Sequence, residues 1–571
     1  MDDLIEFLSG IDIFSDLSDE WLMHLCQSSE FVEYKNSQQV ITMGDLYRYL
    51  WIVYKGKVEV AGINQDGNRL FTTSLNSGDV FGEMSVMLDR PVVEDITAAE
   101  DTSVIKLPRD VFSHVVAQNP STLKKIACIV TERQIRRGQD IQPRGGYRSR
   151  FTDNPDPYDL NLSSAKKQIK LLIINCGSSS LKYSLFDTSS PQSMFEGLIE
   201  NIGAGISPHK LKTVNARIQR NEVVMDIREA FSVMVNALTD KAIGVIRDFS
   251  EIQAVGHRVV HGGNRFSGSA VISDDVKDAI RSCVALAPLH NPYNLTGIEV
   301  MAELLPNTVS VAVFDTAFHQ SMPHQAYNYA LPYQLADDKH IRRYGFHGTN
   351  HHFVALMASM FVKRHVGNLR IISCHLGNGA SICAIDRGRS VDTSMGLTPL
   401  EGLVMGTRCG DIDPGLVLYL LETGMSVDSL EKTLNKESGL KGTSGISNDM
   451  REILKAAEDG DVKAEAALRT FCYRVRKYIG SYLAALGGLD LLIFTGGIGE
   501  NSAEIRARIC QGLGGFGINL DTETNRMAKG QRGNIADIST EASRIRILVV
   551  AADEERMIAR EIIHAVSSLR A

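Results

Sequence analysis

The chain has 571 residues, enough for roughly three or four domains. Its 44% hydrophobic and 22% charged residues are ordinary for a globular protein and exclude wholesale disorder, collagen and a continuous coiled coil. The 60 Lys and Arg against 68 Asp and Glu give a formal net charge of -8, which argues against nucleic acid as the main partner.

The nine cysteines are sparse, and no two have the C-x-x-C spacing, so we expect free thiols rather than disulfides or structural zinc. The N-terminus, MDDLIEFLSG, is acidic and lacks the pattern of a signal peptide. No apolar run reaches the roughly 18 residues that cross a bilayer. We therefore expect a soluble, cytoplasmic protein without a membrane partner.

Residues 1–137 predict a small β-barrel or jelly roll with helices. A short helical pattern opens the chain, and brief strand-like runs follow, separated by Gly and Asp turns. The predicted strands are Gln39–Met43, Tyr49–Tyr54, Lys57–Ile63, Leu70–Leu75 and Ser103–Leu107. A helical pattern starts at Asp110, breaks at Asn119-Pro120 and resumes to about Arg137.

Residues 138–168 predict a linker, because prolines and glycines replace apolar periodicity. Arg136, Arg137, Arg144, Arg148 and Arg150 form a basic cluster in and beside it. A solvated tether is the favoured interpretation, and docking onto an acidic face of a neighbouring domain is the alternative.

From Ile169 onward the pattern is α/β, with strands alternating with long helices. Apolar residues recur every three or four positions over Ala464–Leu486, and Gly487-Gly488 ends that helix. Lys170–Asp187 and Arg370–Asp386 each read as a strand, a polar Gly/Ser/Asn turn and a second strand. This repeat predicts two duplicated lobes, approximately 169–316 and 317–571, with turns that offer backbone N–H groups to phosphates.

The familiar phosphate motifs are absent or out of context. Gly512–Gly517 fits G-x-G-x-x-G but follows a predicted helix rather than a strand, so it is not a dinucleotide fingerprint. No P-loop sequence occurs.

Polar clusters are the stronger chemical signal. They are Asn175–Lys182, His257–Gly263, Ala287–Pro292, Val313–His319, Tyr344–His351 and Gly406–Asp411. Each taken singly is more often structural than functional, but their joint occurrence favours a site.

In this order, the clusters resemble the acetate kinase (acetokinase) family. The matching motifs are INCGSSSLKYSLFD, HRVVHGG, APLHNP, VFDTAFH, YGFHGTNHH, CHLGNGASICAI, MGLTPLEGLVMGTR, FTGGIGEN and ADEE. The resemblance runs from about Ile169 to the C-terminus. It implies the two-lobed fold of acetate and sugar kinases, actin and heat-shock ATPases, and Mg²⁺-dependent phosphoryl transfer from ATP to acetate, giving acetyl phosphate and ADP. It also implies a homodimer.

The resemblance further implies residue roles. Arg408 and His347 would stabilise the transition state, and Asp315 would orient an arginine or the substrate rather than obligatorily transfer a proton. Asn175 and Glu554 match the metal site, for Mg²⁺ or alternatively Mn²⁺. The substrate-binding residues would be Arg258, which holds the carboxylate, with Val260, Leu289, His290, Phe346 and Pro399. The ATP-binding residues would be Ser178, Ser180, Lys182, His375, Leu376, Gly377, Asn378, Gly379, Asp449, Met450, Arg451, Gly497, Ile498, Gly499, Glu500 and Asn501.

General chemistry agrees with this set of residues. A carboxylate acceptor is already ionised at neutral pH, so it needs no base, and the difficulty is its repulsion from the γ-phosphate. Positioning and charge neutralisation should dominate, and arginines bind both kinds of anion in a bidentate manner.

Two alternative functions remain open. One is a kinase for propionate or another short-chain acid, because a pocket discriminates one methylene by only about 1–3 kcal/mol. The other is a catalytically weak sensor. Six residues present together argue against it: Asn175, Arg258, Asp315, His347, Arg408 and Glu554. The sequence departs from the family at Ala552-Asp553, where Thr-Asn is usual, and so adds a negative charge beside the proposed metal site.

Residues 1–137 resemble a cyclic-nucleotide-binding domain through Ile41–Asp45, Leu50–Val60 and Gly78–Met84. Glu83 matches the acceptor for the ribose hydroxyl. Val92, however, stands where the family has its phosphate-binding arginine, and Glu94-Asp95 replace a small pair. An apolar residue and two acids disfavour a cyclic phosphate, although Arg90 is an alternative cation.

We therefore predict that the chain does not bind cyclic AMP or cyclic GMP in the usual way. Calorimetry with each nucleotide should show no micromolar binding. Micromolar binding to the 1–137 region would overturn this prediction.

Overall fold

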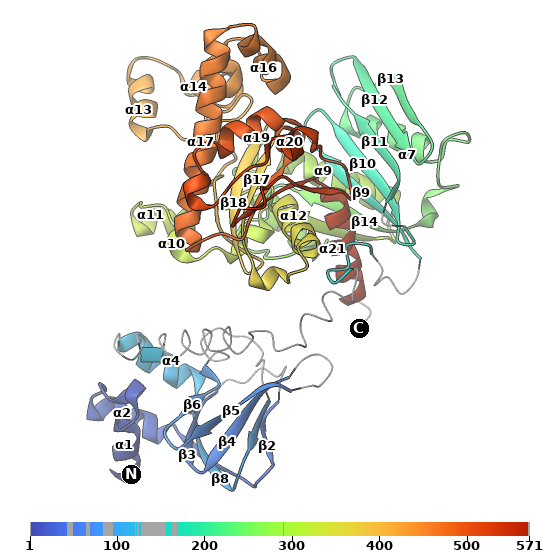
Figure 1. Cartoon of the computed structure of the whole chain (residues 1–571). Coiled ribbons are helices and arrows are strands. Elements are labelled where there is room, and N and C mark those ends of the chain that lie inside the picture. Colours follow the sequence, from blue (N-terminus) through green and yellow to red (C-terminus); the bar gives the residue numbers. More distant parts are fainter. Residues whose placement is uncertain are drawn as a thin grey trace. The chain divides into compact units, whose positions relative to one another are not determined.

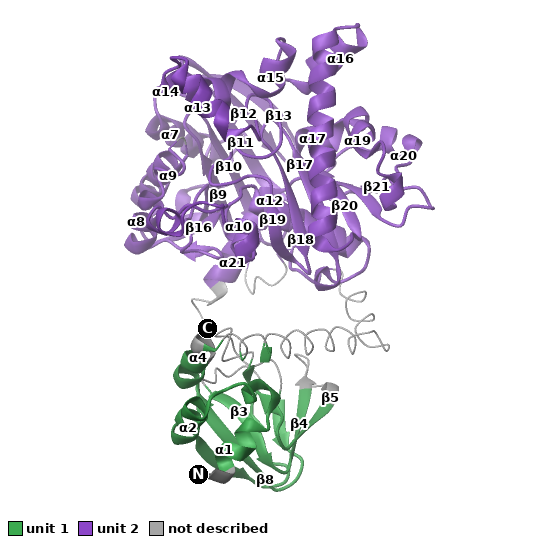
Figure 2. Ribbon diagram, turned by 90° about the vertical axis from the view of Figure 1, so that its left-hand side faces the viewer, with its two compact units in different colours: residues 1–149 green, residues 150–571 purple. Residues whose placement is uncertain are grey.

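The computed structural model describes residues 2–42, 49–63, 69–83, 95–119, 122, 125–126, 156–162, 168–190, 192–288 and 290–568. Arg90, Val92 and Leu289, together with most of the predicted helix after Asn119 and the basic cluster, lie outside these residues. The chain forms two compact units, residues 1–149 and 150–571 (Figure 2).

The N-terminal unit is built from two antiparallel four-stranded sheets, in the orders β1-β8-β3-β6 and β2-β7-β4-β5. The strands are β1 (Glu30–Tyr34), β2 (Gln39–Ile41), β3 (Tyr49–Lys55), β4 (Lys57–Ile63), β5 (Arg69–Asn76), β6 (Val80–Phe81), β7 (Asp95–Ala98) and β8 (Thr102–Pro108). The helices include α1 (Asp2–Ser9), α2 (Asp19–Gln27) and α4 (Arg109–Gln118). The predicted jelly-roll-like architecture and its five strands are confirmed. β1, β6 and β7 were not predicted, because they are short and β1 is largely exposed.

The C-terminal unit contains two larger sheets (Figure 1). The first has the order β13-β12-β11-β10-β9-β14-β16-β15, and the second has β19-β18-β17-β20-β22-β21. The strands of the first are β9 (Lys170–Cys176), β10 (Leu181–Asp187), β11 (Ser193–Ile199), β12 (Ile206–Thr213), β13 (Arg217–Val223), β14 (Ile252–Val259), β15 (Ala270–Val271) and β16 (Val309–Phe314). Those of the second are β17 (Arg370–Leu376), β18 (Ala380–Asp386), β19 (Arg389–Thr393), β20 (Leu491–Thr495), β21 (Ile535–Asp537) and β22 (Arg546–Val550).

The two sheets repeat one topology. An antiparallel hairpin, β9–β10 or β17–β18, lies beside two further strands parallel to its first strand, β14 and β16 or β20 and β22. An antiparallel edge strand, β15 or β21, closes each series. The duplication expected from the two sequence hairpins is therefore present in the sheet order itself.

The helices follow the expected local chemistry. The longest, α17 (Val462–Leu486), begins where Asp461 accepts hydrogen bonds from the Lys463 and Ala464 N–H groups, and ends at Gly487 with φ 63°. Its predicted apolar positions are buried. No helix in the described part of the chain is long and apolar enough to span a membrane.

Besides α17, the C-terminal unit has the α-helices α7 (Ile227–Leu238), α8 (Asp274–Ser282), α9 (Asn291–Leu304), α10 (His324–Tyr327), α11 (Tyr333–Asp338), α12 (Gly348–Phe361), α13 (Pro414–Glu422), α14 (Val427–Lys432), α15 (Gly439–Ser444), α16 (Met450–Glu458), α18 (Gly496–Asn501), α19 (Ala503–Cys510), α20 (Thr522–Met527) and α21 (Glu554–Ser568).

The two halves of the unit exchange helices. The C-terminal helix α21 packs on the first sheet, where Ile558 and Ile562 join the core formed by β9, β14 and β16. Helix α12, which follows the first sheet in sequence, packs instead against β17, β20 and β22. Helices α12 and α21 also contact each other, as Figure 1 shows. A division of the lobes at residue 316 does not describe this exchange.

Part of the segment expected to be a solvated linker is buried on the C-terminal unit. Leu160 is 1% exposed and packs in the core between α12 and the second sheet, whereas Leu162 is fully buried beside α21. Arg556 Nε of α21 donates to the Leu160 carbonyl at 2.7 Å, and Arg560 Nε donates to the Tyr158 carbonyl at 2.7 Å. Residues 156–162, the docking segment, thus belong to the structure of this unit.

The hydroxyl of Tyr158 allows a test of the docking segment. It lies 2.7 Å from Ser359 Oγ on α12 and accepts a hydrogen bond from Val366 N at 2.7 Å. We predict that Tyr158→Phe lowers the free energy of unfolding by about 1–3 kcal/mol, because Val366 N loses its acceptor. Urea unfolding measures the loss. Tyr333→Phe, at a residue 80% exposed, is the control and should change stability by less than about 0.5 kcal/mol. Equal effects of the two substitutions would contradict the prediction.

Candidate active site

Strand register brings polar side chains of the first sheet to one edge. Lys182 on β10 is paired directly with Asn175 on β9. The parallel pairing of Ile174 with His257 places Arg258 of β14 beside them. Asp315 follows the last residue of β16, and its N–H donates to the Val259 carbonyl at 3.0 Å. These residues lie at or near the carboxyl ends of parallel strands, where α/β sheets bind ligands.

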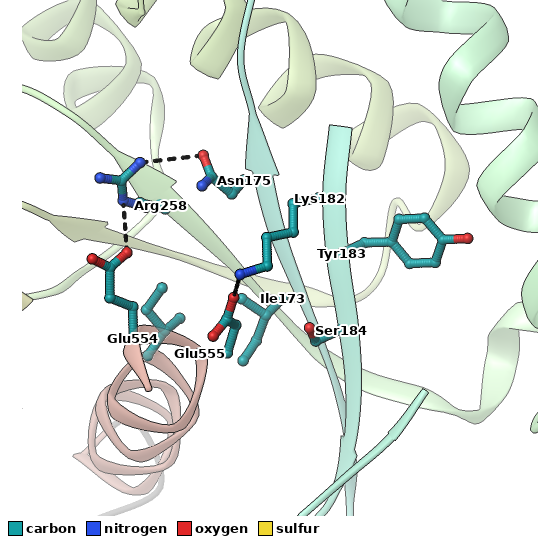
Figure 3. A pocket seen from close by; sticks show the side chains of 9 residues that line it. Ile173, Asn175, Lys182, Tyr183, Ser184, Arg258, Glu554 and Glu555 are labelled. Atoms are coloured by element: carbon teal, nitrogen blue, oxygen red, sulfur yellow. Dashed lines mark hydrogen bonds and ion pairs between the residues drawn. The ribbon is translucent and has the colours of Figure 1, made fainter. Parts of the chain in front are cut away.

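Arg258 is the centre of this group. Its Nε and Nη2 donate to the two carboxylate oxygens of Asp315 at 3.2 and 2.5 Å. Its Nη1 donates to Asn175 Oδ1 at 3.5 Å, and its Nε lies 3.4 Å from Glu554 Oε2 at the start of α21. Figure 3 shows Asn175 and Glu554 reaching Arg258 from different elements. Arg258 is therefore fixed between two acids and an amide.

Asp315 is a buried carboxyl, with its side chain 2% exposed. Burial raises its pKa to about 6, and Glu554 adds to this rise, whereas Arg258 opposes it. We expect Asp315 to be mostly ionised at neutral pH and to take up a proton as the pH falls through about 6. In its ionised form it orients the Arg258 guanidinium by a bidentate contact.

The start of α21 carries more acids than Glu554. Glu555 forms an ion pair with Lys182, and its other oxygen lies 3.6 Å from Arg532 Nη2. Arg532 Nε lies 4.0 Å from Asp553, and its Nη1 donates to Glu196 at 2.5 Å. The extra charge of Asp553 is therefore close to a cation, and burial raises the pKa of its carboxyl.

His347 and His375 form the imidazole side of the site. Their rings stack with centroids 4.3 Å apart. His347 precedes α12 with a left-handed backbone, φ 58°, and its Nδ1 lies 2.9 Å from Ser381 Oγ on β18. Burial, with the neighbouring His375, holds the pKa of His347 well below its usual value, and burial lowers that of His375. Both imidazoles are therefore neutral at physiological pH.

Arg408 lies close to His347. A Cβ built on Gly379 would lie 3.6 Å from Arg408 Nη1 and 3.8 Å from His347 Nε2, so both side chains face this turn. Arg408 Nη1 donates to the Pro399 carbonyl at 3.2 Å and lies 3.6 Å from Met405 Sδ. Among the residues that the structure describes, no carboxylate forms an ion pair with Arg408. Burial lowers its pKa, which reflects the cost of a charge withdrawn from water.

In addition to burial, Arg258 and Arg408 both lower the pKa of His290 and of His347. After burial, which is the main cause, Arg258 and Arg408 lower the pKa of His290 to about 4, and both contribute to the low pKa of His347. Val260 and Phe346, which are 6% and 2% exposed, pack in one apolar cluster with Met405. Leu289, which we expected in this pocket, lies outside the described residues.

The expected nucleotide-binding residues occupy turns and helix starts. Ser178 and Ser180 lie in the β9–β10 turn, and Gly377–Gly379 form the β17–β18 turn. Asn378 accepts hydrogen bonds from Gly406 N through its carbonyl and from Asn448 Nδ2 through its side chain. Gly497–Asn501, including Ile498 and Gly499, form most of α18 after β20.

Two of these residues have structural partners of their own. Asp449 caps α16, the helix that Met450 begins, and forms an ion pair with Arg451, which is exposed. Glu500 Oε1 accepts from Gly496 N and Ala552 N, both at 2.9 Å, and so ties α18 to the segment before α21.

Hard oxygen atoms suited to a divalent cation come from Asn175 and Glu554, which contact the same guanidinium. No group of three or more His, Cys, Asp and Glu side chains in the described residues has the arrangement of a metal cage. Few protein ligands suit Mg²⁺, which usually keeps several waters.

Comparison with known proteins agrees with this geometry. The acetokinase family model matches residues 170–560. The chain belongs to the acetokinase family. It is 50% identical over 394 residues to the acetate kinase of Clostridium botulinum (strain Okra / Type B1), a match covering 69% of this chain and 98% of that relative.

Solved structures give the same result. The acetate kinase of Porphyromonas gingivalis matches with a TM-score of 0.66 and 41% identity, covering 70% of this chain and all of that one. A propionate kinase from Francisella tularensis subsp. tularensis SCHU S4 matches with a TM-score of 0.64 and 42% identity, covering 69% of this chain and 98% of that one.

In the N-terminal unit, the model of the cyclic nucleotide-binding domain family matches residues 31–119. Both predicted resemblances are thereby confirmed, and the chain is a kinase with an appended domain of this second family.

The burial of Asp315 predicts the pH dependence of the reaction. We expect kcat/KM for the acceptor to fall as the pH drops through about 6, because protonated Asp315 no longer orients Arg258. The pKa of His290 is about 4 and that of His347 is far below its usual value, so neither imidazole titrates near pH 6. A pH–rate profile tests this. Asp315→Asn should be slower and lack this limb. Asp392→Asn, at another carboxyl whose pKa burial raises, should keep it. A limb that persists in Asp315→Asn would refute the assignment.

Proposed function

We propose that the C-terminal unit reversibly transfers the γ-phosphoryl group of ATP to the carboxylate of acetate, giving acetyl phosphate and ADP. The observation that carries this proposal is Arg408, a half-buried cation with no carboxylate partner among the described residues. A charge partly withdrawn from water without an acid beside it is costly, and an anionic ligand would compensate.

The acceptor would be held on the first-lobe side. Arg258 binds the carboxylate, and Asp315 fixes the orientation of the guanidinium, since both of its oxygens accept from it. The methyl group would enter the apolar cluster that contains Val260 and Phe346. Pro399 and His290 would complete this pocket. The carboxylate attacks as an anion, so no residue has to remove a proton from it.

Arg408 and His347 act on the transferring group. As it passes between two oxygens in line, charge spreads over its equatorial oxygens. Arg408 Nη1 and the Nε2 edge of His347 both face Gly379, where the group would lie between them. A neutral His347 donates a hydrogen bond there without adding a like charge beside Arg408.

The donor nucleotide would lie along the turns of both lobes. Ser178, Ser180 and Lys182 are on one side, and His375, Leu376 and Gly377–Gly379 are on the other. Asp449–Arg451 and Gly497–Asn501 bind the nucleoside part. Asn175 and Glu554 hold Mg²⁺ or Mn²⁺, which neutralises phosphate charge when bound.

Acetate is preferred over propionate on the size of the pocket. Val260 limits its depth, but one methylene changes discrimination by only about 1–3 kcal/mol. The similarity to a propionate kinase supports keeping this acid as the second candidate. We also propose a cytoplasmic homodimer in which the N-terminal unit does not take cyclic nucleotides through the usual arginine.

Kinetics of arginine variants test the reaction. In a coupled assay with acetate, propionate and butyrate, we predict that Arg408→Ala loses about 10³-fold or more in kcat. Arg258→Lys, which keeps a charge beside Asp315, should raise the acetate KM about tenfold because it loses the bidentate fork. Arg228→Ala, at an exposed residue paired with Glu303, is the control and should be unaffected.

Near-normal turnover of Arg408→Ala would refute its role. Turnover faster with propionate than with acetate would move the assignment to the longer acid, and no turnover with any acid would favour a sensor.

A further inference from the structure

A hydrogen-bonded chain of two serines and two histidines lies behind the site. His347 Nδ1 is 2.9 Å from Ser381 Oγ, and His351 Nε2 is 2.8 Å from the same hydroxyl. His351 Nδ1 is 2.9 Å from Ser373 Oγ. Ser373, Ser381 and His351 are fully buried. The order of the chain is therefore Ser373, His351, Ser381, His347, and only its last member faces the site.

Each of these hydrogen bonds has one proton between two heavy atoms. The donors and acceptors of the hydrogen-bonded chain can therefore be arranged in two ways, which run in opposite directions along it. Burial lowers the pKa of both imidazoles strongly, so each ring is neutral and holds one proton. The Ser381 hydroxyl must then donate to one ring and accept from the other. In the first direction Ser381 donates to His347 Nδ1, which leaves the proton of His347 on Nε2. In the second direction His347 carries its proton on Nδ1, and its bare Nε2 faces the site.

The far end of the chain decides between them. In the first direction the Ser373 hydroxyl donates to His351 Nδ1, and every proton within the series has an acceptor, while the Nε2 proton of His347 faces the site. In the second direction His351 Nδ1 donates to Ser373, whose own proton then needs another acceptor. Within the described part of the chain Ser373 Oγ has no hydrogen bond besides that with His351. A buried hydroxyl proton without an acceptor is unfavourable, so the first direction is the stable one.

We propose that Ser373, His351 and Ser381 are positioning residues that fix the Nε2–H tautomer of His347 and so aim a hydrogen-bond donor at the transferring phosphoryl group. This inference rests on the proposed function for the role of the donor, but the tautomer is a property of the protein itself. With the wrong tautomer, the Nε2 lone pair of His347 would face the phosphate oxygens and repel them.

Nitrogen NMR of the full chain with ¹⁵N-labelled histidine tests the tautomer directly. The His347 signals are assigned by their loss in His347→Gln. In the wild type we expect a protonated Nε2 and a bare Nδ1 from pH 6 to 9. In Ser381→Ala the two nitrogens should shift toward an average of both tautomers, and kcat should fall about three- to tenfold with both KM values within about twofold.

A matched control separates tautomer from packing. Ser394 is equally buried, on the same lobe, but its hydroxyl accepts from Ile382 N rather than from a histidine. Ser394→Ala should leave the His347 signals unchanged. A wild-type His347 protonated on Nδ1 overturns the proposal, even if Ser381→Ala does not fold. An unchanged tautomer and kcat in a folded Ser381→Ala also overturns it. If the protein transfers no phosphoryl group but His347 shows the expected tautomer, the proposed function is wrong. The inference that Ser373, His351 and Ser381 fix the tautomer is then still supported.

Discussion

Arg408 of the C-terminal unit has no carboxylate partner among the residues that the structure describes. Arg408 has a backbone carbonyl and a thioether as its polar neighbours, whereas Arg258 has two acids and an amide. Removing a guanidinium from water without an acid to pair it costs stability, and an anionic ligand would offset that cost. The two arginines therefore differ: Arg258 is held by two acids and an amide, whereas Arg408 is the arginine to which the proposed function assigns an anion.

Topology explains how these groups meet. Asn175, Arg258 and Asp315 lie together because β9, β14 and β16 are adjacent and parallel. Their partner Glu554 is the first residue of α21, which comes from the second lobe and packs on the first sheet. His347 precedes α12, which packs on the second sheet. Exchange of α21 and α12 thus supplies each sheet with a helix that starts at the site. Neither lobe alone contains the arrangement.

Patterns local in sequence predicted much of this fold. The two hairpins and the long helix follow from apolar residues that recur with periods of two and of about 3.6 residues. The polar turns between these elements contained the motifs that resemble the family. The docking segment could not be predicted that way, because Leu160 and Leu162 are isolated apolar residues whose burial depends on α12 and α21, far along the chain. The hydrogen-bonded chain behind His347 was missed for the same reason. The spacing of His347 and His351 places them one turn apart, but only the β17–β18 pairing brings Ser373 and Ser381 to them.

The charges of the site are divided between its two sides. On the first-lobe side Asp315, Asp553, Glu554 and Glu555 outnumber the cations Arg258, Lys182 and Arg532 that contact them. That excess of negative charge suits a divalent cation next to Asn175 and Glu554. On the other side Arg408 is a positive charge that no acid pairs with in the described part of the chain, and His347 and His375 are neutral. A metal-bound nucleotide and an anionic acceptor are complementary to such a gradient. Asp553 lies 4.0 Å from Arg532, which also pairs with Glu196 on β11 and with Glu555, so its added charge shares one cation with two other acids.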